Sequence, residues 1–96
     1  MTVKHVVWMK FKVAVTPARM SEHVRALQGL TTRVPGILDL SVGANFTDRA
    51  NGFTHGLVVT LEDRAALERY SAHPAHVEVA AALRLDADLQ ALDYEC

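Results

Sequence analysis

Histidines are the residues of this sequence most suited to chemistry, because imidazole gains and loses a proton near neutral pH. The five are His5, His23, His55, His73 and His76. His76 ends the segment His73-Pro74-Ala75-His76, and Tyr70 lies a short distance before it. A neutral imidazole can remove a proton from a carbon next to a carbonyl, and a tyrosine hydroxyl can stabilise the enolate that forms. His76 and Tyr70 are therefore candidates for acid–base chemistry.

Two predicted strands place further candidates on one face of a sheet. Residues Val3 to Phe11 and Phe53 to Leu61 are rich in β-branched and aromatic side chains, which favour strands. Because alternate residues of a strand share a face, each strand presents one histidine among apolar neighbours. The candidate substrate-binding residues on this face are His5, Val7, Met9, His55, Leu57 and Val59.

A helix is predicted between these strands. Thr16-Pro17 has the residue types of a helix N-cap and first helical position, and Val34-Pro35-Gly36 breaks the helix after about Thr32. Its apolar residues recur at helical spacing and predict a buried stripe. The stripe consists of Met20, Val24, Leu27 and Leu30. His23, on the outer part of this helix, is expected to face solvent.

The remaining elements complete a β-α-β-β-α-β order. A strand is predicted from Ile37 to about Phe46, a helix capped by Asp63 and ending at Tyr70, a helix from Pro74, and a strand over 89–96. Leu67 is the expected inward residue of the Asp63 helix. This order predicts an α+β, ferredoxin-like fold with one antiparallel sheet and helices on one face. His76 would then lie in the first turn of its helix, where the dipole disfavours the charged imidazolium.

Composition limits the classes of partner. The formal charge of −1 gives no electrostatic footprint for nucleic acid or a polybasic membrane anchor, and no apolar run approaches the roughly 20 residues that span a bilayer. We expect one domain over residues 1–96. Cys96 is the single cysteine, so a cytoplasmic location is the default expectation. No metal-ligand, nucleotide, flavin or haem motif is present, so we expect no cofactor and no metal.

The second face of the predicted sheet carries Val6 and Trp8 with no helix to cover them. Exposed apolar sheet faces are association surfaces. We therefore expect a homodimer in which two sheets pair and Trp8 becomes buried.

Several segments together resemble the stress-responsive α/β-barrel (Dabb) domain family, and the resemblance covers essentially the whole chain. They are Lys4-His5-Val6-Val7, Lys10-Phe11-Lys12, Val34-Pro35-Gly36, Val42-Gly43, Phe53-Thr54-His55, Val58-Val59-Thr60, Tyr70, His73-Pro74-Ala75-His76 and Asp93-Tyr94-Glu95. The resemblance implies a dimeric α+β barrel of two ferredoxin-like subunits. A cyclase of this family closes a linear polyketide by aldol condensation without a cofactor. Its catalytic histidine and tyrosine match His76 and Tyr70, and two pocket histidines match His5 and His55.

Two functions follow as hypotheses. The first is a cofactor-free small-molecule enzyme resembling a polyketide cyclase, lyase or isomerase. The resemblance implies that Val24 and Leu27 are walls of its substrate-binding site, where they replace bulky aromatic residues of the family's cyclase. The second is a non-catalytic dimer that serves in stress tolerance or binds a small hydrophobic metabolite. Cofactor-free monooxygenases share the fold and are a further analogy. In the non-catalytic case His5 and His55 are core histidines, Tyr70 closes the core, and His73 only begins a helix.

Overall fold

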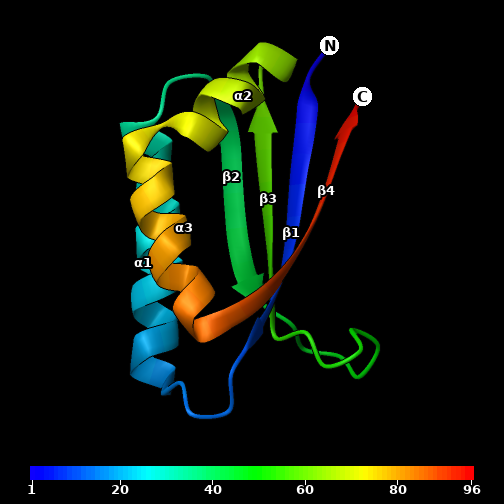
Figure 1. Ribbon diagram of the computed structural model, residues 1–96. Helices are drawn as coiled ribbons and strands as arrows, with labels where there is room; N and C mark the ends of the chain where they lie inside the picture. The colour runs from blue at the N-terminus through cyan, green and yellow to red at the C-terminus, as the bar shows by residue number, and fades with distance from the viewer.

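The computed structural model describes all residues, 1–96, and has the predicted element order with the second helix broken in two. Figure 1 shows the four strands side by side and the three helices beside them. The elements are β1 (Val3–Phe11), α1 (Pro17–Arg33), β2 (Ile37–Ala44), β3 (His55–Leu61), α2 (Arg64–Ala72), α3 (Pro74–Asp86) and β4 (Ala87–Glu95).

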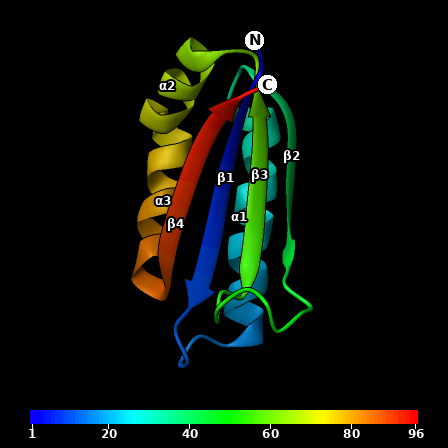
Figure 2. The ribbon, with the colours of Figure 1, turned by 90° about the vertical axis from the view of Figure 1, so that its right-hand side faces the viewer.

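The strands form one antiparallel sheet in the order β2-β3-β1-β4. All three helices cover the same face, and the opposite face is open (Figures 1 and 2). This is the ferredoxin-like α+β arrangement that the sequence predicted. Because β1 and β4 pair antiparallel, with Val3 opposite Glu95, the two chain termini lie together at one end of the molecule, as Figure 2 shows.

Side-chain caps set the starts of the helices where the sequence predicted them. The Thr16 hydroxyl accepts a hydrogen bond from the Arg19 amide, and the Asp63 carboxylate accepts one from the Ala66 amide. His73 both ends α2 and caps α3, because its Nδ1 accepts from the Ala75 amide. The prediction that His73 serves helix entry is therefore confirmed.

Some boundaries differ from the predicted ones. Strand β4 begins at Ala87 rather than Leu89, because its ladder with β1 extends to the pair of Phe11 and Ala87. Strand β3 begins at His55 rather than Phe53. The segment just before it is a turn, in which Asn51 and Gly52 both have positive φ.

The buried faces of two helices are rotated from the predicted ones. In α1 the buried residues are His23, Leu27 and Leu30, while Met20 and Val24 are only partly buried. In α2 the prediction of Leu67 as the main inward residue was wrong, since Ala66 and Tyr70 are buried and Leu67 is partly exposed. Close packing explains why Ala66 is small, because a Cβ added to Gly36 would lie only 3.2 Å from the Ala66 Cβ.

The uncovered face of the sheet keeps large apolar side chains in contact with solvent. Trp8 is 44% exposed, and so are Leu92 and Tyr94 of the adjacent strand β4, which lie opposite Val6 and Lys4. Trp8 packs edge-on against Phe53, with ring centroids 5.6 Å apart. None of the three helices is long and apolar enough to cross a membrane.

Candidate functional site

The rings of His5, Tyr70 and His76 meet where α2, α3 and β1 come together. We call these three residues and Asp93 the His76 cluster. The Tyr70 ring lies 4.4 Å from the His76 ring and 5.7 Å from the His5 ring, centroid to centroid. Tyr70 comes from the last part of α2, and His76 lies in the first turn of α3 beyond the break at Pro74. The break in the helix is therefore what turns His76 back toward Tyr70.

Hydrogen-bond partners fix which nitrogen of each imidazole carries the proton. Nδ1 of His76 lies 3.1 Å from the Ser71 carbonyl oxygen, which can only accept, so Nδ1 donates and Nε2 is left as the basic nitrogen. Nδ1 of His5 is hydrogen-bonded to the Asp93 carboxylate, which assigns the same tautomer to His5. Asp93 was not among the predicted site residues. It could have been found from the antiparallel pairing of the terminal strands, which places it opposite His5.

Burial shifts the pKa values of this cluster in directions that suit proton transfer. Loss of solvation lowers the pKa of His76 below its ordinary 6.5 and outweighs the hydrogen bond to the Ser71 carbonyl, which raises it. Electrostatic interactions with His5 and Arg84 add smaller decreases. Burial raises the pKa of Tyr70 to about 12. At neutral pH the cluster therefore holds a neutral imidazole beside a protonated phenol.

The Tyr70 hydroxyl has no hydrogen-bond partner in the chain. The residue is only 1% exposed, and burial is the single cause of its raised pKa. Every fully buried side-chain polar atom of the chain has a hydrogen-bond partner, so the unpaired Tyr70 hydroxyl is not fully buried. The hydroxyl therefore lies at the edge of the packed core, where its O–H can donate a hydrogen bond to a ligand or solvent. The His5 side chain is 14% exposed, and His76 is partly exposed.

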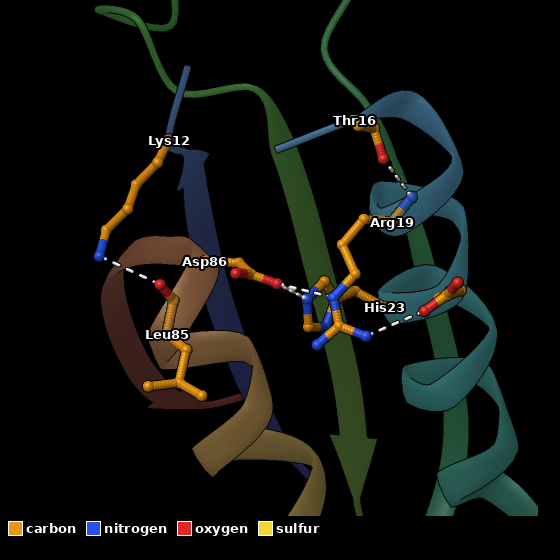
Figure 3. A network of polar contacts seen from close by, with 7 residues as sticks. Lys12, Thr16, Arg19, His23, Leu85 and Asp86 are labelled. Atoms are coloured by element: carbon orange, nitrogen blue, oxygen red, sulfur yellow. Dashed lines mark hydrogen bonds and ion pairs between the residues drawn. The ribbon is translucent and has the colours of Figure 1, made fainter. Parts of the chain in front are cut away.

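A second group of histidines lies at the other end of β1, and we call it the His23 cluster. It consists of Phe11, Arg19, His23, His55 and Asp86. Both Nε2 of His23 and Nε of Arg19 bind the same Asp86 oxygen, at 2.6 and 2.8 Å (Figure 3). The His23 and His55 rings contact Phe11, with centroids 5.7 and 5.0 Å away.

The expectation that His23 faces solvent was wrong, since this side chain is only 4% exposed. The carboxylate of Asp86, at the end of α3, provides the partner that allows an imidazole to be buried (Figure 3). The hydrogen bonds from His23 and Arg19 both lower the pKa of Asp86, and the one from His23 has the larger effect.

The structure separates His55 from the other three histidine and tyrosine candidates. In the β1–β3 register His55 lies opposite Met9, four positions along β1 from His5, which corresponds to about 13 Å. Most of the apolar candidates occupy the core between the two clusters. Those buried there are Val7, Met9, Leu27, Leu57 and Val59. Val24 is partly buried and lines an open cleft together with His55.

The cleft nearest the His76 cluster opens beside it, between α2 and the adjacent ends of β1 and β4. Its volume is about 330 Å³, and its lining includes Val3, Leu67 and Asp93. Asp93 thus connects the cleft to His5. The ion pair of Arg64 with Glu95 lies at the same opening, so the lining combines apolar walls with charged groups.

A sheet ordered β2-β3-β1-β4 with all helices on one face defines a ferredoxin-like α+β protein. The chain belongs to the Dabb family, because the profile of the stress responsive A/B barrel domain matches residues 3–96. The resemblance seen in the sequence is confirmed.

Known proteins support the same assignment. Olivetolic acid cyclase from Cannabis sativa is 34% identical over 79 residues, which are 80% of this chain and 78% of the cyclase. The structure of At3g17210 from Arabidopsis thaliana is 30% identical, with a TM-score of 0.90 over 98% of this chain and 94% of that chain. A dimeric ferredoxin-like protein of unknown function from Thermobifida fusca YX is 22% identical, with a TM-score of 0.89 over 100% and 92% of the two chains. The relatives therefore include a named cyclase.

Proposed function

We propose that this protein is a cofactor-free small-molecule enzyme that closes a ring by aldol condensation, as a polyketide cyclase does. The observation that carries the proposal is the His76 cluster, where a neutral imidazole with a free Nε2 lies against a protonated phenol. The 34% identity to olivetolic acid cyclase supports the reaction class.

In the proposed reaction, Nε2 of His76 removes a proton from a carbon between two carbonyl groups. The enolate oxygen accepts a hydrogen bond from the Tyr70 hydroxyl, whose raised pKa keeps it protonated. The enolate carbon then attacks a second carbonyl of the same molecule, forming a carbon–carbon bond and an alkoxide. The imidazolium of His76 returns its proton to the alkoxide, and loss of water from the ring completes the condensation.

The other members of the cluster have supporting roles in this proposal. Asp93 holds His5 through Nδ1, so that the second imidazole has a fixed orientation beside Tyr70. Val3 and Leu67 line the adjacent cleft, and they would contact an apolar portion of the substrate. The substrate class is therefore a small hydrophobic or polyketide-like molecule with at least two carbonyl groups.

Replacing Tyr70 by Phe tests the proposal with little risk to folding, because the hydroxyl makes no hydrogen bond within the chain. The purified Tyr70→Phe protein is incubated with linear polyketide thioesters, and cyclised products are measured by mass spectrometry. We expect a loss of about 10²- to 10³-fold in turnover with an unchanged melting temperature.

Thr31→Val is the control for loss of a hydroxyl, because Thr31 is an exposed residue of α1 outside the cleft beside the His76 cluster. It should keep full turnover. Equal turnover by the wild type and the Tyr70→Phe protein would contradict the proposal. Absence of any cyclised product from the wild type would favour a non-catalytic binding protein.

We also propose that the functional unit is a homodimer paired through the uncovered sheet face. The dimeric protein from Thermobifida fusca has the same fold, and Trp8, Leu92 and Tyr94 form an exposed apolar surface on this face. Burial of that surface would stabilise association by about 25 cal/mol per Å² before the entropic costs of association. Sedimentation velocity should give twice the mass of one chain, and a monomer at micromolar concentration would contradict the proposal.

A further inference from the structure

Two glycines on the uncovered face of the sheet serve no purpose within the chain. Gly56 of β3 lies opposite both Gly43 of β2 and Trp8 of β1 in the strand register. Neither glycine has a positive φ, and a Cβ added to either would meet no atom within 4 Å. Glycine inside a strand destabilises the chain and often marks a site where a ligand or another chain approaches closely. The two glycines therefore suit a partner rather than the fold.

The glycines form part of a groove of about 350 Å³ on this face, and we call it the glycine groove. Trp8 and Phe53 also line it. The Trp8 ring packs edge-on against Phe53 and remains 44% exposed, so it does not cover Gly56. The glycine groove therefore has room for an aromatic side chain from another molecule.

The uncovered face is divided into a bulky half and a small half. Alternate residues of each strand share this face, so the register gives the layout. The bulky half, on β1 and β4, carries Val6, Trp8, Leu92 and Tyr94. The small half, on β2 and β3, carries Ser41, Gly43, Gly56 and Val58. A face that is bulky on one side and hollow on the other is complementary to itself, as a two-fold interface requires.

Two copies can bring these faces together about a two-fold axis that runs either along the strands or across them. An axis along the strands lays β1 over β3 of the partner, so that Trp8 lies over the partner's Gly56. An axis across the strands lays β1 over the same strand of the partner, so that Trp8 meets the partner's Val6 and the two hollow halves face each other. Because sheets pack about 10 Å apart with interlocking side chains, the first arrangement fills the glycine groove.

Charge favours the same arrangement. Lys4 and Asp39 lie on this face in register with Thr60, and neither has an ion-pair partner in the chain. The axis along the strands places Asp39 opposite the partner's Tyr94 and beside the partner's Lys4. The axis across the strands places Lys4 against the partner's Lys10, where like charges repel.

We propose that the chain pairs with a second copy about an axis parallel to the strands, with Trp8 of each copy seated in the glycine groove of the other. Lys4 of each copy pairs with the partner's Asp39. This pairing rests on the homodimer proposed above and specifies which half of the face meets which.

Gly56→Leu tests the pairing, because the space around Gly56 is open within the chain. It should raise the dissociation constant of the dimer about 30-fold or more, measured by sedimentation equilibrium. Trp8 is the single tryptophan, so its emission should stay at the longer wavelength of an exposed indole in this variant. Gly29→Leu is the matched control, since a Cβ at Gly29 of α1 also meets no atom within 4 Å, and it should keep the wild-type dimer.

Reversal of one charge tests the pairing independently of the glycine groove. Asp39→Lys should weaken the dimer about tenfold at low salt and less at high salt, and adding Lys4→Glu should restore most of the affinity. Circular dichroism checks that each variant is folded. A monomeric wild type would overturn both this pairing and the homodimer. A dimer that keeps its affinity in folded Gly56→Leu or in Asp39→Lys would overturn the pairing alone and leave the homodimer standing.

Discussion

The two histidine clusters have similar residue types but opposite electrostatic arrangements. In the His23 cluster, Asp86 accepts hydrogen bonds from both His23 and Arg19, so these two side chains have a charged partner. In the His76 cluster, the catalytic candidate His76 bonds only to the backbone carbonyl of Ser71, and the Tyr70 hydroxyl has no partner. A satisfied network stabilises the fold, whereas unsatisfied groups remain available to a ligand.

The largest expected difference between the clusters is in turnover. His76→Gln should lower the rate of cyclisation by about 10²- to 10⁴-fold, because the amide cannot serve as a base. His23→Gln keeps a donor toward Asp86 and should retain most of the activity. Rates are measured with the same polyketide thioesters. If the two variants lose activity equally, the distinction between a catalytic and a structural cluster is wrong.

Stability should show the reverse order. His23→Ala removes a buried ring that packs on Phe11 and bonds to Asp86, so we expect a loss of about 1–3 kcal/mol in the free energy of unfolding. His76→Ala removes a partly exposed ring and should cost less. Urea denaturation of both variants measures the difference. A greater loss for His76→Ala would reverse the assignment of roles.

The smallest expected effect is a pH dependence that appears only at the His76 cluster. Because the pKa of His76 is lowered, the imidazole stays neutral at pH 7, and turnover should fall only as the pH drops below the ordinary value of about 6.5. Tyr70, with a pKa of about 12, stays protonated through the alkaline range, so no alkaline decline should arise from it. The pH profile of turnover tests both limbs. An acid limb that begins above pH 7 would contradict the lowered pKa.

Local sequence signals account for most of the fold. Thr16, Asp63 and Pro74 mark helix starts that depend on neighbouring residues alone, and the structure places all three helices at them. The alternation in β1 likewise predicted its bounds and its buried face. The boundary of β4 was less predictable, because pairing with β1 rather than local propensity sets where it begins.

The candidate site was predicted in part. The spacing of Tyr70 and His76 across the break at Pro74 is a local property, and it brings the two rings together. His55 was predicted to lie near His5 only because both residues are on the same face of the sheet. The antiparallel register of β1 and β3 places them four positions apart along β1. Predicting Asp93 as a site residue would have required knowing that β4 pairs with β1.

The sequence by itself determined the element order, the helix starts and the proximity of Tyr70 to His76, since these depend on contacts between residues close in the chain. Only the tertiary structure decided which partners the histidines have. His23 is buried because α3 ends with Asp86 beside α1, and His5 has a fixed tautomer because β4 places Asp93 next to it. An imidazole takes its function from the charge and solvation around it, and both come from residues far apart in the chain.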